Sequence, residues 1–350
     1  MTITTANLRG VTGRILHLSG TVRDCTLNER NVIPTSCGDL IPRYEKLETR
    51  TKPGQSLSFY KSGALRSVYL EDQTEVATPI GPLPAELVSF HEDGSLNTIF
   101  QLNGQLSYAW TETDEKRLAK EWTLAFDFAT ITAKMIAVRF HPSGQVRSLT
   151  LWPGETLMLN TPVGEIACRT GLSVHPNGTL ASFEPALPVA LETPIGYVLA
   201  YDVDAFTIDG DQNSVRFDDQ GNLTQVTTAG EVIVEGPDGT VHISSKTRYA
   251  LTEDVRVKLS IELSFDGDQV RIDTGRAAQT FAIAENKFTV LTDINTKGLT
   301  SCDVGCDSGS CDSGDCDGGS CDSGSCETGS CSTGTGCDSC VDGKCSGKCA

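Results

Sequence analysis

The residues with the clearest chemical potential are eleven cysteines near the end of the chain. They are separated by two to five residues and lie at Cys302, Cys306, Cys311, Cys316, Cys321, Cys326, Cys331, Cys337, Cys340, Cys345 and Cys349. Thiolates are the ligands that soft and borderline metal ions prefer, and tetrahedral sites accept cysteines separated by two to four residues. The spacing therefore predicts that these eleven cysteines bind a metal ion. It does not distinguish zinc, copper(I) and iron, with or without iron–sulfur units.

The segment that holds these cysteines, residues 299–350, has almost no side chains that could form a core. Residues 301–350 contain 11 Gly, 11 Ser and 8 Asp, but no aromatic residue and no Leu, Ile or Met. Such a composition cannot bury enough apolar surface to offset the entropy of ordering. In its cysteine density and lack of aromatic residues this tail resembles metallothioneins, although the C-x-C pairs of animal metallothioneins are absent. The resemblance implies metal storage or trafficking.

Other interpretations of the tail stay open at this stage. It could be a reduced, metal-free segment that keeps the protein soluble, or a segment crosslinked by disulfides. It could also be the substrate of a modifying enzyme or a redox-active appendage, with the rest of the chain serving recognition. A coil with a period of five residues is a further alternative, because Cys306 to Cys331 follow one another at that interval.

Charge and composition narrow the partners and the compartment. The chain has 350 residues and a formal net charge of −18. Such an acidic surface argues against nucleic acids and anionic membranes as partners. No apolar run approaches the ~18 residues of a membrane span, and the first residues do not resemble a secretory signal. We therefore expect a cytoplasmic protein, in which dense cysteines favour metal binding over disulfides.

An internal repeat occupies the middle of the chain. An apolar residue is followed by three positions, a glycine, one position and an aliphatic residue; the copies are SFYKSGAL (58–65), SFHEDGSL (89–96), RFHPSGQV (139–146), SVHPNGTL (173–180) and RFDDQGNL (216–223). A second element, T-P-[IV]-G, occurs at 78–81, 161–164 and 193–196. Glycine between short β-rich runs is typical of tight hairpin turns.

These hairpins predict the fold. A single hairpin cannot bury its apolar face, so successive units must line up into one sheet. The F-x-x-x-G-x-L pattern over residues 57–245 resembles MORN-type repeats, which implies an extended antiparallel meander. We expect a mainly β protein with a mixed N-terminal segment at 1–54, a repeat domain at 55–298 and the tail at 299–350. One helix, at about 112–122, is expected between hairpins, with Trp110 and Trp122 packing it.

The remaining candidates for chemistry have simpler structural interpretations. His91, His141 and His175 recur at one position of the repeat, where Tyr60 and Asp218 also occur, so we expect turn residues and not metal ligands. We interpret four aspartates as a solvated loop, because an EF-hand spacing is absent; they are Asp202, Asp204, Asp209 and Asp211.

The three cysteines before the tail are Cys25, Cys37 and Cys168. A metal site that uses Cys25 and Cys37 is a minor alternative, and His17 beside either cysteine carries no signature of a nucleophile and its base. The chain contains no P-loop, GxGxxG, GxSxG or HExxH motif, so we do not expect an enzyme. We expect a metal-binding protein whose β body docks a protein client or a modifying enzyme.

Overall fold

The computed structural model describes residues 7–45, 50, 54–107, 110–202, 205, 210–249 and 256–292. It also describes two short strands, β27 (Cys340–Val341) and β28 (Lys344–Cys345). The chain divides into two compact units, Met1–Ile294 and Asn295–Ala350. The first unit is called the body below and the second the tail.

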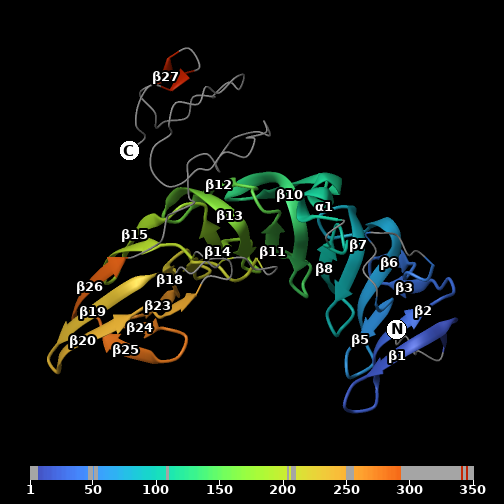
Figure 1. The fold of residues 1–350 in the computed structure, drawn as a ribbon, viewed down its shortest axis with the longest axis horizontal. Helices are drawn as coiled ribbons and strands as arrows, with labels where there is room; N and C mark the ends of the chain where they lie inside the picture. Colours follow the sequence, from blue (N-terminus) through green and yellow to red (C-terminus); the bar gives the residue numbers. More distant parts are fainter. Residues whose placement is uncertain are drawn as a thin grey trace. The chain divides into compact units, whose positions relative to one another are not determined.

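The body is built around one long antiparallel sheet of 17 described strands, which follow the chain from β1 to β25 in Figure 1. Consecutive neighbours across it are β1 (Val11–Leu16), β2 (Val22–Leu27), β5 (Leu57–Phe59), β6 (Leu65–Val76), β7 (Leu83–Phe90), β8 (Leu96–Phe100), β10 (Ala129–Phe140), β11 (Val146–Leu151), β13 (Gly164–Val174), β14 (Leu180–Pro185), β17 (Val215–Phe217), β18 (Leu223–Thr228), β23 (Ile261–Asp266), β24 (Gln269–Asp273) and β25 (Ala278–Ala282). The predicted meander is thus confirmed.

The other two strands of the 17-stranded sheet, β9 (Glu121–Phe126) and β12 (Leu157–Thr161), pair with the first halves of β10 and β13. Shorter hairpins of the body form a second set of strands. These are β3 (Ile33–Thr35) with β4 (Gly38–Leu40), β15 (Val189–Thr193) with β16 (Gly196–Ala200), β19 (Gly230–Gly236) with β20 (Gly239–Ser244) and β26 (Lys287–Thr292), and β21 (Thr247–Tyr249) with β22 (Arg256–Lys258). Buried residues of these hairpins, such as Leu40 and Val198, belong to the same apolar cluster as the long sheet. One core therefore serves both sets of strands.

A tight turn joins the two long-sheet strands of each repeat, and it is the same turn six times. These first turns span His17–Gly20, Tyr60–Gly63, His91–Gly94, His141–Gly144, His175–Gly178 and Asp218–Gly221, and they define repeats 1 to 6. In each, the first residue receives a hydrogen bond at its carbonyl from the glycine amide, at 2.8–3.1 Å. The six glycines have φ between +85° and +95°, a region that residues with a Cβ rarely adopt. A register shift precedes every turn, for example between Ser89 and Phe90.

In repeats 1 to 5 the first residue of the first turn also links its repeat to the next one. Its ring nitrogen or hydroxyl lies 2.9–3.1 Å from the carbonyl oxygen of the apolar residue that precedes the following turn: His17 to Phe59, Tyr60 to Phe90, His91 to Phe140, His141 to Val174 and His175 to Phe217. A carbonyl oxygen only accepts hydrogen bonds, so each histidine donates from a protonated Nε2. We call these five bonds the ladder. It ends in repeat 6, where the Asp218 carboxylate accepts hydrogen bonds from Asn222 instead.

A second kind of turn, T-x-x-G, occurs four times in the described part of the body. Its threonine hydroxyl donates to the glycine carbonyl at 2.5–2.7 Å in four turns, which start at Thr35, Thr78, Thr161 and Thr193. The Thr35 turn, T-S-C-G, was not recognised in the sequence because it lacks proline.

The tips of three T-x-x-G turns lie against glycines of first turns two repeats further on. Ser36 donates to the carbonyl of Gly94 at 2.9 Å. Pro79 and Pro162 lie so close to Gly144 and Gly221 that a Cβ on either glycine would be 3.3 Å from the proline ring. These contacts fold the T-x-x-G hairpins back over the sheet.

The N-terminal segment is continuous with the repeat sheet. Strands β1 and β2 form repeat 1, and β2 pairs with β5 of repeat 2 through Asp24–Ser58 and Cys25–Leu57. Leu16, Gly20 and Val22 match the apolar–glycine–aliphatic spacing of the other copies. The repeat therefore begins before the expected start at residue 55.

The inserted helix, α1, spans Glu112–Leu118 and is shorter than predicted. Thr111 caps its N-terminus in a capping box with Asp114. The helix ends because Ala119 is extended, and β9 starts two residues later by pairing with β10. Trp122 is consequently a buried residue of a strand and does not pack from the helix.

The buried helix residue Glu115 ties α1 to two distant segments. Its carboxylate accepts hydrogen bonds from Arg50 at 2.7 and 3.1 Å and from the indole of Trp110 at 2.6 Å. Arg50 in turn binds both oxygens of Glu86 at 2.8 and 2.9 Å. Trp110 thus positions the helix, as expected, through a hydrogen bond. Among the described residues, no helix is both long and apolar enough to cross a lipid bilayer.

The ladder predicts a measurable loss of stability when one donor is removed. Tyr60→Phe keeps the ring but deletes the hydroxyl that donates to the Phe90 carbonyl. We expect the free energy of unfolding to fall by about 1 kcal/mol, the usual net value of one hydrogen bond. Urea denaturation measures this, with Tyr197→Phe, at an exposed tyrosine outside the ladder, as the control. Equal stability of Tyr60→Phe and wild type would contradict the ladder.

The turn contacts predict that two equivalent glycines differ in sensitivity. Alanine at Gly63 or Gly144 must adopt a positive φ, which costs about 1–2 kcal/mol. Only Gly144 also has a neighbour in the way, the Pro79 ring at 3.3 Å, whereas nothing lies within 4 Å at Gly63. Gly144→Ala should therefore destabilise the body more than Gly63→Ala, and the difference should vanish in a Pro79→Ala background. A difference that persists without the Pro79 ring would refute the turn-on-turn contact.

Candidate functional site

The predicted metal ligands all belong to the tail. Cys302, Cys306, Cys311, Cys316, Cys321, Cys326, Cys331, Cys337 and Cys349 lie outside the described residues. The backbones of Cys340 and Cys345 are described, and these two residues are direct partners where the short strands β27 and β28 pair. The structure thus places two of the eleven predicted ligands opposite each other in one antiparallel pair.

The three cysteines of the body have a different character. Cys25, Cys37 and Cys168 are buried and unpaired. Burial raises the pKa of Cys25 to about 11, although nearby Arg14 opposes the shift, and burial also raises the pKa of Cys37 and Cys168. Because a thiol must lose its proton to bind a metal, these three side chains are structural. Within the described part of the chain, no three His, Cys, Asp or Glu side chains are grouped closely enough to hold a metal ion.

The histidines singled out in the sequence are turn residues, as predicted. His91, His141 and His175 use Nε2 to bind the next repeat, and His17 does the same. The amide of Asn97 donates to Nδ1 of His91 at 3.2 Å, which fixes a neutral ring. His17 is therefore a ladder donor and is not paired with Cys25 or Cys37.

Glu184 is a buried carboxylate whose pKa is strongly raised, and sequence analysis did not single it out. Its side chain is fully buried on β14 and accepts hydrogen bonds from the backbone amides of Ser214 at 2.8 Å and Asp202 at 3.1 Å. The Arg169 guanidinium lies 3.7 Å away and stacks over the Tyr201 ring. Burial outweighs these contacts and raises the pKa of Glu184 to about 7.

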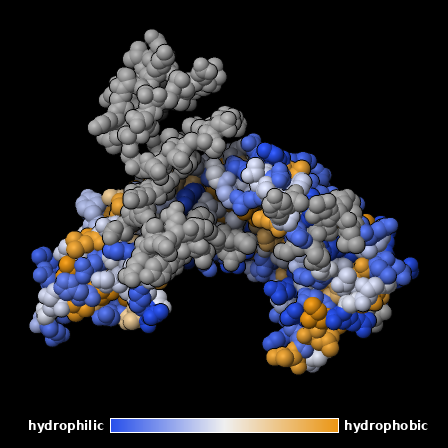
Figure 2. Space-filling model, viewed as in Figure 1, coloured by the Kyte–Doolittle hydropathy of each residue, from blue (hydrophilic) through white to orange (hydrophobic). Residues whose placement is uncertain are grey.

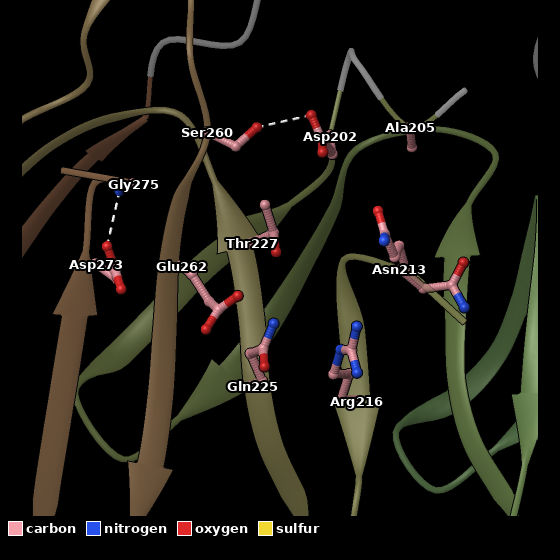
Figure 3. Close-up of a pocket in the computed structure, with 11 residues that line it drawn as sticks. Asp202, Ala205, Asn213, Arg216, Gln225, Thr227, Ser260, Glu262, Asp273 and Gly275 are labelled. Atoms are coloured by element: carbon pink, nitrogen blue, oxygen red, sulfur yellow. Dashed lines mark hydrogen bonds between the residues drawn. The ribbon is translucent and has the colours of Figure 1, made fainter. Parts of the chain in front are cut away.

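Next to this carboxylate lies a polar cavity of about 520 Å³ (Figure 3). Figure 3 shows Arg216, Gln225 and Glu262 on the neighbouring strands β17, β18 and β23. The described residues that line the cavity include three carboxylates, those of Asp202, Glu262 and Asp273, and the guanidinium of Arg216; Asp273 also pairs with Arg271.

One wall of the cavity holds unused hydrogen-bonding capacity. Asn213 is 5% exposed, and its amide nitrogen donates to Ser182 and to the Gly210 carbonyl, both at 2.7 Å. Its Oδ1 has no hydrogen-bond partner, and neither has Nε of Arg216. Both atoms are buried in the wall, so they are unsatisfied groups of the fold and are not open to a ligand in the cavity.

The four aspartates of the 202–211 segment do not act as one group in the described structure. Asp202 accepts a hydrogen bond from Ser260 at 2.7 Å, and Asp211 forms an ion pair with Arg147. Asp204 and Asp209 lie outside the described residues. The sequence signal for the cavity was present but unspecific, because Arg216 occupies the position before the apolar residue of the repeat, where Arg139 stands in another copy and serine in three.

Comparison with known proteins adds no relatives. No family model, no curated protein and no solved structure matches this chain.

The raised pKa of Glu184 predicts how stability depends on pH. The folded state favours the protonated carboxyl, so the contribution of Glu184 to stability should be fully present below the ordinary pKa of 4.5 and be lost as the pH rises through about 7. The shift corresponds to about 3 kcal/mol. Glu184→Gln should remove this part of the pH dependence, measured as the difference in unfolding free energy between acidic and mildly alkaline buffer. Glu165→Gln, at an exposed glutamate of β13, is the control, and equal pH dependence in all three proteins would contradict the assignment.

Proposed function

We propose that the protein binds a soft or borderline metal ion through the thiolates of its tail, for storage or trafficking in the cytoplasm. The carrying observation is the division of thiols between the two units. The body keeps its three cysteines buried, with pKa values raised by burial, and it uses four of its histidines in the ladder. The eleven cysteines outside the body stand among Gly, Ser and Asp, which lets thiolates gather around an ion.

The body, in this proposal, docks a protein client. The polar cavity supports this part, because its described lining carries three carboxylates and one guanidinium, so its acidic side suits a positively charged side chain even though Asp273 also pairs with Arg271. Such a side chain would be hydrogen-bonded and charge-paired as it enters. The body would then hold the tail near the molecule that receives or supplies the metal.

Metal content tests the proposal directly. The full chain is purified without oxygen, titrated with zinc and copper(I), and compared with a variant in which all eleven tail cysteines are serine. We expect the variant to lose nearly all bound metal while its unfolding transition stays unchanged, because serine preserves the length and formal charge of the tail. Cys37→Ala, which keeps every tail thiol, is the control and should bind as much metal as the wild type.

Two outcomes would overturn the metal proposal. One is equal metal content in the wild type and the tail variant. The other is a wild-type protein with free thiols that bind neither zinc, copper(I) nor iron. If the intact mass instead shows modified or disulfide-bonded tail cysteines, the tail is a substrate or a redox appendage and the body serves recognition.

A further inference from the structure

Repeat 1 exposes an apolar position that every other repeat buries. Leu16 precedes the first turn of repeat 1 and is 54% exposed. The equivalent residues of repeats 2 to 6 are at most 3% exposed; they are Phe59, Phe90, Phe140, Val174 and Phe217. In those repeats a preceding repeat packs alongside. Among the described strands none lies on the outer side of β1, and Leu16 is exposed there.

Two neighbours of Leu16 extend this apolar surface. Ile15 is 51% exposed and stands where repeats 2 to 6 have serine or arginine. Leu18 is fully exposed and stands where they have lysine, glutamate, proline or aspartate. Figure 2 shows apolar surface at the end of the body that holds β1 and β5. Terminal units of repeat proteins ordinarily present a polar outer face, and this one does not.

The backbone of β1 is open as well. Among the described strands, β1 pairs with β2 alone, so its other edge offers unpaired amides and carbonyls. The Leu16 carbonyl is the counterpart of the five ladder acceptors, and none of the described ladder donors binds it. An interface that is repeated through the whole body thus stops at β1 with both its apolar and its hydrogen-bonding parts unused.

The opposite end of the sheet differs from β1. Strand β25 exposes Ala278, Gln279 and Thr280, which are small or polar. The apolar edge of one molecule therefore matches the same edge of a second molecule better than it matches β25.

The directions of the strands also favour a contact between the β1 edges of two molecules. Fourteen antiparallel steps separate β1 from β25 along the sheet order given above, so these two strands run in the same direction. A head-to-tail neighbour with its core on the same side would have to pair in parallel. A neighbour related by a two-fold axis normal to the sheet would pair β1 with β1 in the antiparallel manner of every other pair, with both cores on one side. Two-fold contacts are also the commonest in homo-oligomers.

We propose that a second copy of this chain binds the open edge, so that the two β1 strands pair antiparallel and Ile15, Leu16 and Leu18 of both copies are covered. The body sheets then form one continuous sheet across the dimer. This dimer is independent of the metal proposal, because it uses no tail residue.

Sedimentation of the full chain tests the dimer. A reducing agent and a chelator are present, so that neither disulfides nor bridging metals join the tails. The wild type should dimerise, and Ile15→Lys/Leu18→Lys should weaken association at least tenfold, since both apolar side chains are replaced by charges in each copy. Met158→Lys, at an apolar residue of β12 that is 56% exposed, is the control and should dimerise like the wild type. A wild type that stays monomeric, or an edge variant that dimerises unchanged, would overturn the proposal.

Hydrogen exchange locates the contact. Amides of residues 11–16 should gain protection from exchange as the protein concentration rises. This should hold in the wild type and in the variant whose eleven tail cysteines are serine. Concentration-dependent protection at β25 in place of β1 would refute the two-fold pairing of β1 with β1. Loss of metal binding with the dimer intact would count against the proposed function alone.

Discussion

The body depends on one recurring interaction, the hydrogen bond from the first residue of each first turn to a backbone carbonyl of the next repeat. Each such bond contributes only about 1 kcal/mol on balance, much less than the shared apolar core. Its directionality matters more, because it fixes the position of one turn relative to the next. The donor at that place is histidine in four repeats and tyrosine in one, and the turn has glycine at positive φ in all six. Asp218 cannot donate, and the ladder ends there.

This constraint assigns roles to residues that otherwise suggest chemistry. Histidines whose Nε2 binds a carbonyl are committed to structure, and cysteines whose thiols are buried keep their protons. The T-x-x-G turns add contacts between repeats that are two apart, so each unit is held by several neighbours, as in other repeat architectures. We propose that metal chemistry in this chain belongs to the tail thiols, with the body as a scaffold that positions them near a client.

Sequence reasoning succeeded where local chemistry decides the conformation. Glycine at a tight turn and the recurrence of His91, His141 and His175 predicted the hairpins and the structural role of the rings. It missed repeat 1, although Leu16, Gly20 and Val22 have the required spacing. The T-S-C-G turn at Thr35 was missed because the sequence pattern included a proline. The structure shows that the threonine and the glycine make the hydrogen bond that defines the turn.

Other features depend on contacts that no local pattern encodes. The helix was extended to 122 because its composition favours helix, yet pairing of β9 with β10 ends it at Leu118. The pKa of Glu184 is shifted by segments that meet it only in the folded chain, and the cavity near Asn213 joins residues from five segments. Likewise, the apolar residues of repeat 1 are exposed because β1 is an edge strand of the described sheet.

The protonation of the histidine rings tests the central claim most directly. Nitrogen–proton correlation spectra of the imidazoles, recorded at alkaline pH, distinguish Nε2–H from Nδ1–H tautomers. The ladder predicts that His17, His91, His141 and His175 all carry the proton on Nε2 and exchange it slowly, whereas His242, whose Nδ1 lies 2.8 Å from Glu231, carries it on Nδ1. Rings of the first four that populate Nδ1–H, or that exchange as fast as free imidazole, would contradict the account.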